Sequence, residues 1–242
     1  MRSREIVSGG LLLLLLVAGT SALAEEETRR EVRRKIVPLE KLMQRLEDPQ
    51  TIQRKQPEKV IELFGVKRGE TVADIGAGTG VFSFRLAAKV GSAGKVYAVE
   101  IEDPMLDFIS NKAQQLRVTN LIPVKSSDVG PNLPAGCCDK ILLMSAYEYL
   151  PDPVAFMTVA RQALKPGGTV AIVSLDGNKV KVKRKLTLKE ELYTPEKVAE
   201  EMKRAGFTLR ETHDIFEKRL FMIFEVSHTK AVPAATPSGT GH

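Results

Sequence analysis

The sequence of 242 residues contains no tryptophan, 5% aromatic residues and two cysteines. So few aromatic side chains leave little material for stacking nucleic-acid bases. Cys137 and Cys138 are adjacent, and since neighbouring cysteines cannot easily bridge, the chain has no disulfide framework. Without a histidine nearby, two sulfurs are not typical of a metal site. We therefore expect no metal and no nucleic-acid partner, and we expect Cys138 to pack inward at the start of a strand.

The excess of positive charge is small. Lys and Arg number 36 against 30 Asp and Glu, which gives a net charge of +6, and 43% of the residues are hydrophobic. This composition is typical of a globular fold, and it excludes a collagen, a disordered tail protein and a multi-span membrane protein. Nothing in it resembles a polybasic arm, so we expect at most a weak attraction to anionic partners.

Residues 1–24 have the pattern of a secretory signal peptide. A short basic start is followed by the leucine run Leu11–Leu16, and small residues lead to a cleavage point after Ala24. The apolar run is shorter than the roughly 20 residues that a membrane span needs. We therefore predict export to the periplasm or the medium, with an uncleaved membrane anchor as the alternative.

The remaining chain divides into three parts. Residues 25–56 are predicted to form a charged, helical N-terminal extension, residues 57–228 one domain, and residues 229–242, rich in small residues and proline, a disordered tail. The basic cluster Arg29–Lys35 could associate with a membrane surface, although a solvated helix face is the interpretation we favour. The sequence makes no prediction of the oligomeric state.

Strand-like and helical segments alternate through residues 57–228. Short connections and right-handed crossovers then give an α/β fold with a doubly wound, mostly parallel seven-stranded sheet. The last two strands are separated by Glu217–Arg219, and a connection that short predicts a C-terminal antiparallel hairpin. The expected strands are 71–75, 95–99, 121–124, 141–144, 169–174, 208–216 and 220–227, and the expected helices are 38–47, 57–64, 81–90, 104–118, 153–164 and 195–205.

A glycine-rich loop follows the first expected strand, with glycines at 76, 78 and 80 after Asp74. Open parallel sheets bind ligands beyond the carboxyl ends of their strands, and glycines allow the backbone to turn sharply and approach a ligand. The dinucleotide fingerprint would require a glycine at position 81, which is Val81, and a P-loop would require Lys and Ser or Thr after Gly80. This disfavours an NAD-linked oxidoreductase.

The spacing instead resembles the first motif of class I S-adenosylmethionine-dependent methyltransferases, and the resemblance extends from about residue 57 to residue 226. Val96–Glu100 resembles the family's second strand, whose final carboxylate holds the ribose hydroxyls. The resemblance implies that Asp128 accepts a hydrogen bond from the adenine amino group. It also places Ser145 at the mouth of the pocket and makes the fold Rossmann-like, with the terminal hairpin as the sixth and seventh strands.

The resemblance implies S-adenosylmethionine as the cofactor. Three of the residues it assigns keep structural alternatives, since Asp74 could cap the turn, Glu100 could end a strand in solvent and Asp128 could be an ordinary loop residue. The predicted cofactor-binding residues are Asp74, Gly76, Ala77, Gly78, Thr79, Gly80, Glu100, Ile101, Met105, Ser127, Asp128, Val129 and Ser145.

The catalytic group is not identified. Quinone-modifying relatives often carry a histidine near positions 147–149, but here Tyr147 and Glu148 stand in that stretch, and the histidines lie at 213, 228 and 242. These two side chains are the candidates for a general base, with packing or the start of a helix as the alternative. The absence of Asn-Pro-Pro-Tyr at 145–148 disfavours a nucleic-acid acceptor.

The sequence therefore predicts a methyltransferase that acts on a small-molecule or lipid-like acceptor by in-line methyl transfer. A protein methyltransferase and an exported, non-catalytic binding module that retains the nucleotide pocket stay open as alternatives. The basic segment 179–189 is predicted either to cover the acceptor site or to form a solvated loop.

Overall fold

The computed structural model describes residues 38–179 and 193–227, which belong to two compact units that divide after Pro57. The predicted signal peptide, the tail and nearly all of the basic segment 179–189 lie outside the described residues. Within the part that the structure describes, no helix combines the length and the apolar character needed to cross a bilayer.

The first unit contains two short helices, α2 (Leu39–Glu47) and α3 (Pro49–Lys55). Asp48 separates them, and its carboxylate accepts a hydrogen bond of 2.7 Å from the backbone N–H of Thr51. This cap and the proline at the first helical position start α3. The sequence predicted α2 but not α3, since the charged stretch after residue 47 has no apolar periodicity.

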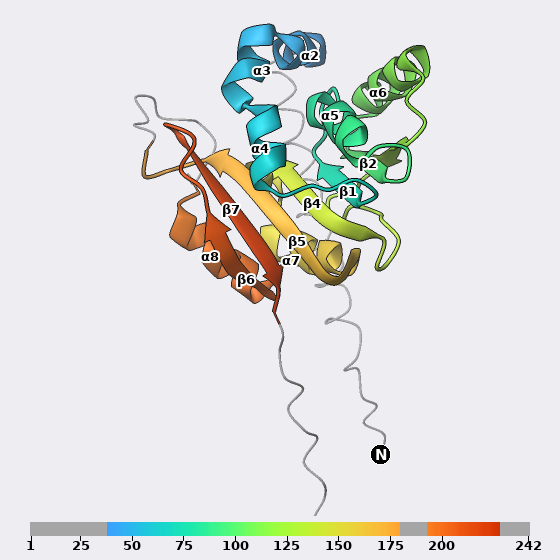
Figure 1. Cartoon of the computed structure of the whole chain (residues 1–242). Coiled ribbons are helices and arrows are strands. Elements are labelled where there is room, and N and C mark those ends of the chain that lie inside the picture. The colour runs from blue at the N-terminus through green and yellow to red at the C-terminus, as the bar shows by residue number, and fades with distance from the viewer. Residues whose placement is uncertain (1–37, 180–192, 228–242) are drawn as a thin grey trace, which may run out of the picture. The chain divides into compact units, whose positions relative to one another are not determined.

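The second unit is built around a seven-stranded sheet with the order β3-β2-β1-β4-β5-β7-β6 (Figure 1). Strands β1 to β5 run parallel, and β7 is antiparallel to both β5 and β6. This confirms the predicted doubly wound sheet with its antiparallel hairpin. The strands are β1 (Thr71–Ile75), β2 (Lys95–Glu100), β3 (Leu121–Lys125), β4 (Cys138–Met144), β5 (Leu164–Leu175), β6 (Phe207–Thr212) and β7 (Arg219–Val226).

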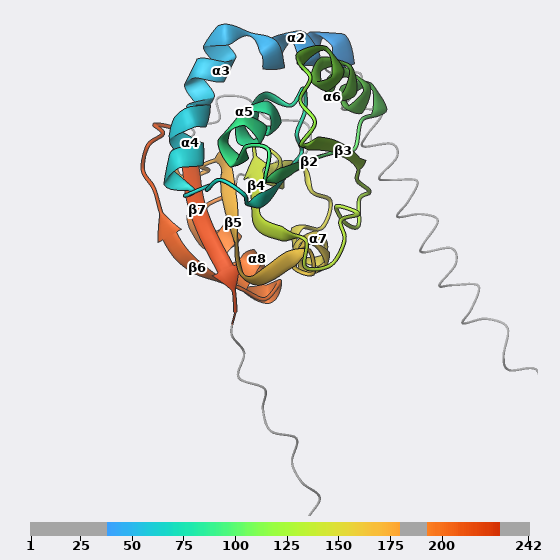
Figure 2. The ribbon, with the colours of Figure 1, turned by 45° about the vertical axis from the view of Figure 1, so that its right-hand side comes forward.

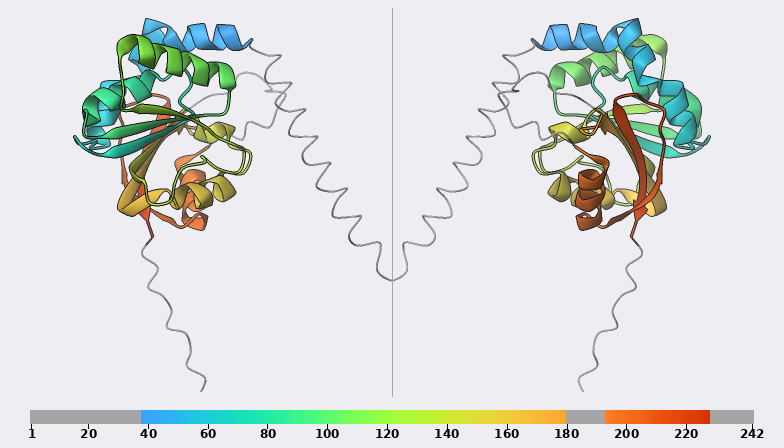
Figure 3. Two further views of the ribbon diagram at one scale, coloured as in Figure 1. Left: turned by 90° about the vertical axis from the view of Figure 1, so that its right-hand side faces the viewer. Right: turned by 90° about the vertical axis from the view of Figure 1, so that its left-hand side faces the viewer.

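Helices cover both faces of this sheet. They are α4 (Pro57–Leu63), α5 (Val81–Val90), α6 (Asp103–Leu116), α7 (Pro153–Arg161) and α8 (Pro195–Arg204), with a short 3-10 helix η1 (Tyr147–Tyr149). Figures 2 and 3 show α7 and α8 on one face and α4, α5 and α6 on the other. On the α7/α8 face the core includes Ile141, Leu143, Phe156, Met157, Val170, Ile172 and Met202. The central strands are apolar on both sides because both sides are covered.

Several element boundaries differ from those expected, and two of these differences change how elements are connected. Helix α7 ends at Arg161 rather than at residue 164, because Leu164 pairs with Cys138 and already belongs to β5. Strand β6 ends at Thr212, so residues 213–218 connect the hairpin in place of a three-residue turn. Cys138 is fully buried at the start of β4, which confirms the prediction for that residue.

Candidate functional site

The order of the strands reverses direction between β1 and β4. From β1 the chain continues outward through β2 and β3, and it then returns to place β4 on the other side of β1. The loops after β1 and β4 therefore leave in opposite directions, which is where open α/β sheets bind ligands. The two loops are in close contact, since a Cβ built at Gly76 would lie 2.5 Å from the Cβ of Ala146.

All three glycines of the loop after β1 have positive φ angles, 72° at Gly76, 57° at Gly78 and 80° at Gly80. At Gly80 a Cβ would also lie 3.0 Å from the Phe84 ring and 3.1 Å from Ile109. Glycine is thus required at positions 76 and 80 by backbone conformation and by neighbouring side chains. The sequence argument attributed these glycines to close approach of a ligand, whereas the structure explains two of them by packing within the protein.

Glu100 ends β2 with a side chain that is fixed on the glycine loop. It is only 6% exposed, so it is not a solvated strand end. Its Oε2 accepts a hydrogen bond of 2.8 Å from the Gly78 N–H, and its Oε1 accepts from the N–H groups of Ile101 (2.6 Å) and Glu102 (3.1 Å). A carboxylate has about four acceptor positions, so these bonds leave one on Oε2.

Two polar side chains of the loop region are buried. Asp74 is 2% exposed and accepts a hydrogen bond of 2.6 Å from the Ser83 hydroxyl, which joins β1 to α5. Thr79 is 1% exposed, and within the described part of the chain its Oγ1 has no hydrogen-bond partner. A buried hydroxyl without a partner costs about 1–3 kcal/mol, so Thr79 offers a hydrogen-bonding group that a bound molecule would satisfy.

The other predicted cofactor residues lie at the same edge of the sheet. Ser127, Asp128 and Val129 form a tight turn after β3, which the Ser127 N–H closes by donating to the Gly130 carbonyl at 3.0 Å. Ile101 follows Glu100, and Met105 is buried in the first turns of α6. The structure thus brings together, beyond the carboxyl ends of β1 to β4, the residues that the sequence assigned to the cofactor.

The two candidates for a general base have different surroundings. Tyr147 is fully buried, and its hydroxyl donates a hydrogen bond of 2.8 Å to Glu201 of α8. Burial, with the Glu201 charge, strongly raises the pKa of Tyr147, so this placement favours the packing alternative. Glu148 is half-buried at the carboxyl edge, where it accepts a hydrogen bond of 2.8 Å from Ser174 of β5.

Sequence reasoning missed a third side chain beside Glu148. Arg219, the first residue of β7, donates a hydrogen bond of 2.7 Å from Nη1 to the hydroxyl of Ser145. Ser145 has a φ angle of 57°, which is unusual for a residue other than glycine. No local pattern pointed to Arg219, because it reaches β4 only through the antiparallel pairing of β7 with β5.

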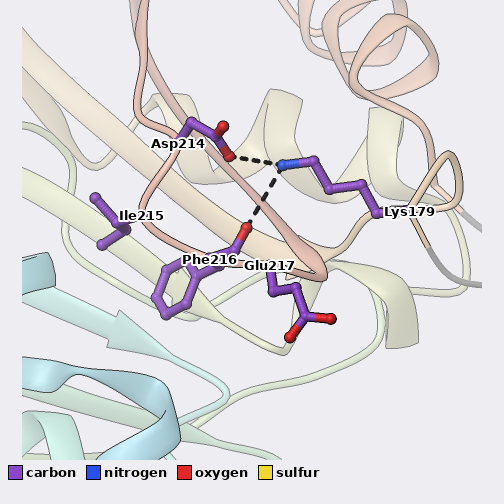
Figure 4. Close-up of a pocket in the computed structure, with 5 residues that line it drawn as sticks. All are labelled: Lys179, Asp214, Ile215, Phe216 and Glu217. Carbon is purple, nitrogen blue, oxygen red and sulfur yellow. Dashed lines mark hydrogen bonds and ion pairs between the residues drawn. The ribbon is translucent and has the colours of Figure 1, made fainter.

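A surface hollow of about 580 Å³ lies on the β5 and β7 side of the same edge (Figure 4). Lys179 lines it and donates to the Asp214 carboxylate at 2.7 Å and to the Phe216 carbonyl at 3.5 Å. The glycine loop is not part of its lining, which consists of Lys179, Asp214, Ile215, Phe216 and Glu217. The hollow therefore lies at the ends of the strands that contribute Ser174 and Arg219, and not at the glycine loop.

The sheet order, the glycine loop at the strand crossover and the terminal hairpin define a Rossmann-like methyltransferase fold. Residues 66–221 match a family described as a methyltransferase domain, and the chain belongs to this family. A solved structure of a SAM-dependent methyltransferase from Aquifex aeolicus is 27% identical, with a TM-score of 0.69 over 76% of this chain and 96% of that one. These findings confirm the predicted family and its cofactor, S-adenosylmethionine.

Curated relatives are more distant. An aklanonic acid methyltransferase from Streptomyces sp. (strain C5) is 28% identical over 116 residues, 48% of this chain and 53% of that protein. A ubiquinone/menaquinone biosynthesis C-methyltransferase from Enterobacter sp. (strain 638) is 28% identical over 114 residues, 47% of this chain and 45% of that protein. The chain thus spans about half the length of the curated relatives it matches.

Proposed function

We propose that this chain transfers a methyl group from S-adenosylmethionine to a small-molecule or lipid-like acceptor. The observation that carries the proposal is the Glu100 carboxylate, buried and fixed on the Gly78 N–H at the crossover of the sheet. The names of the two curated relatives, which refer to aklanonic acid and to quinone biosynthesis, support a small-molecule acceptor for this chain.

The residues at this edge fit the cofactor. The open acceptor position on Oε2 of Glu100 suits a ribose hydroxyl, and the unpartnered hydroxyl of Thr79 suits a polar group of the same molecule. The resemblance assigns Asp128 to the adenine amino group. When bound, S-adenosylmethionine supplies a methyl group activated on a sulfonium.

The protein's own contribution is to hold the acceptor in line with the donor. Fixing two reactants in a productive geometry supplies up to about 7–11 kcal/mol in the best model reactions. We assign the role of general base to Glu148, which Ser174 orients, because the Tyr147 hydroxyl is hydrogen-bonded to α8.

Calorimetry with S-adenosylmethionine and S-adenosylhomocysteine on the full chain tests the proposal. We expect both to bind, and we expect Glu100→Ala to weaken binding at least about tenfold because a hydrogen bond to a charged group is worth roughly 1.5–3 kcal/mol. Thr79→Val, which keeps the shape and removes the hydroxyl, should weaken binding less. Glu200→Gln, at an exposed position of α8, is the matched control and should bind as the wild type does.

Other outcomes would favour the alternatives. If neither compound binds, the proposed methyltransferase activity is contradicted and only a non-catalytic protein with this fold remains. Binding of a nicotinamide cofactor instead would indicate an oxidoreductase. Incubation of host extract with the tritiated donor then separates the acceptor classes, since label in macromolecules rather than in small molecules would indicate a protein methyltransferase.

We also propose that the protein is exported, or is held at a membrane by its leader. The support is the pattern of residues 1–24, a basic start, a leucine run and small residues before Glu25. N-terminal sequencing of the protein from its host, together with cell fractionation, tests this. A mature chain that begins at Glu25 in the exported fraction supports export, and an intact leader in the cytoplasmic fraction contradicts it.

A further inference from the structure

A polar cluster joins the carboxyl ends of β4 and β5 to the amino end of β7. It consists of Ser145 and Glu148 after β4, Ser174 near the end of β5 and Arg219 at the start of β7. Arg219 donates to the Ser145 hydroxyl at 2.7 Å, and the Ser174 hydroxyl donates to the Glu148 carboxylate at 2.8 Å. Ser174 is fully buried and the other three are half-buried, so the cluster is held by the sheet.

The cluster lies close to the cofactor loop, because the residue after Ser145 packs against that loop. Ala146 follows Ser145, and it is so close to Gly76 that a Cβ there would lie 2.5 Å from the Ala146 Cβ. Arg219 is therefore separated from the glycine loop by a short path of direct contacts. A group bound against Arg219 at this edge lies on the β4–β5 side of the cofactor loop, away from β2 and Glu100.

The guanidinium of Arg219 is desolvated but still has hydrogen-bonding capacity. Burial lowers the pKa of Arg219, and the negative charge of Glu148 acts in the opposite direction. The bond to Ser145 uses one of five N–H donors, which form a planar fork suited to carboxylates and other oxyanions. A charge in a partly desolvated site attracts an oxyanion more strongly than an exposed one does.

Apolar surface surrounds this cation. Leu175, which pairs with Arg219 across β5 and β7, is 39% exposed, and Tyr149, the residue after Glu148, is 56% exposed. Such a border suits a molecule whose body is apolar or aromatic and which carries one negatively charged oxygen.

We propose that Arg219 is an acceptor-binding residue that holds an anionic oxygen of an otherwise apolar methyl acceptor beside the cofactor loop. The inference rests on the proposed methyltransferase function and adds to it a chemical class of acceptor. Ser145 orients the guanidinium, and Ser174 orients Glu148, whose charge acts on Arg219.

The test uses the full chain saturated with S-adenosylhomocysteine and two probes of equal size, naphthalenecarboxylate and naphthalenecarboxamide. Calorimetry should show that the wild type binds the carboxylate about tenfold or more tightly than the amide. Arg219→Met should abolish this preference while the protein still binds S-adenosylhomocysteine, and Arg219→Lys should retain part of it. Lys218→Met, at a neighbouring lysine that is 63% exposed, should keep the full preference.

Equal affinity of the wild type for the two probes, or binding of neither, overturns the inference even if no Arg219 variant folds. Loss of the preference in Lys218→Met overturns it as well, since the discrimination would then come from general surface charge. Failure of the wild type to bind S-adenosylhomocysteine contradicts the proposed function itself, and with it this inference. Normal binding of that compound without discrimination between the probes contradicts the inference alone.

Discussion

Tyr147 and Glu201 form a hydrogen-bonded pair whose role is structural. Tyr147 lies in the segment where the sequence predicted a general base, yet its ring is fully buried and forms an edge contact with Tyr193 at 5.3 Å. Its hydroxyl reaches Glu201, far away in the sequence. Buried polar groups need a partner, so the two residues stabilise the contact between η1 and α8.

Glu201 should give the stability of the protein a pH dependence. Burial, the largest influence, raises the pKa of Glu201 above its usual value, and the Tyr147 hydrogen bond and Lys197 oppose it. The folded state then binds this proton more tightly than the unfolded chain does, so the free energy of unfolding falls as pH rises from the usual glutamate range through the folded pKa. Glu201→Gln keeps an oxygen acceptor for Tyr147 and should remove this fall.

Urea unfolding of both proteins over a series of pH values measures the effect. The difference in free energy of unfolding should shift in favour of Glu201→Gln as pH rises. Glu200→Gln, an exposed position on the same helix, serves as the control and should follow the wild type. Parallel curves for wild type and Glu201→Gln would refute the burial argument.

At the scale of elements, the contact between the loops after β1 and β4 fixes the position of the glycine loop. Ala146 has 8% exposure and fills the space in front of Gly76, whose N–H donates to the Val99 carbonyl at 2.9 Å. The glycine loop is thus held by β2 on one side and by the β4 loop on the other. This double attachment means that a change at Gly76 acts on two elements at once.

Gly76→Ala should destabilise the fold by about 2–5 kcal/mol, the sum of a strained left-handed alanine and an overpacked contact. Gly136→Ala is the matched control, since its φ of 61° imposes the strain but nothing lies within 4 Å of the added Cβ. It should cost only about 1–2 kcal/mol. Adding Ala146→Gly to Gly76→Ala should recover the part of the lost stability that comes from the contact with Ala146. Chemical denaturation of the wild type, the two single variants and the double variant measures these differences. Equal costs for the two single variants would show that the loops do not press on each other.

At the scale of the whole molecule, all seven strands of the described sheet and the helices on its two faces come from the second unit, residues 58–242. The family match, residues 66–221, also lies within it. A variant that lacks residues 1–55 should therefore unfold in one cooperative thermal transition, with a melting temperature within a few degrees of that of the full chain. Its affinity for S-adenosylhomocysteine should be unchanged. A molten, non-cooperative transition in calorimetry would show that the N-terminal extension is needed for the core.

The sequence alone determined the class of fold and predicted the edge of the sheet at which the cofactor binds. Apolar periodicity located all seven strands, and the helix 81–90 was predicted with its observed bounds. Asp74, the three glycines and Glu100 could be assigned together because parallel strands place their carboxyl ends at one edge, so a position relative to a strand end is also a position in space.

Only the tertiary structure revealed the polar cluster on which the proposed acceptor site rests. Arg219 and Ser174 lie in segments whose local patterns indicate strands and nothing more, and they meet Ser145 and Glu148 through the pairing of β7 with β5 and β5 with β4. The same holds for Tyr147, which the packing of α8 removes from solvent. Local sequence encodes which element a residue joins, whereas contacts between distant elements depend on the register and stacking of the whole sheet, and these decide which polar side chains face one another.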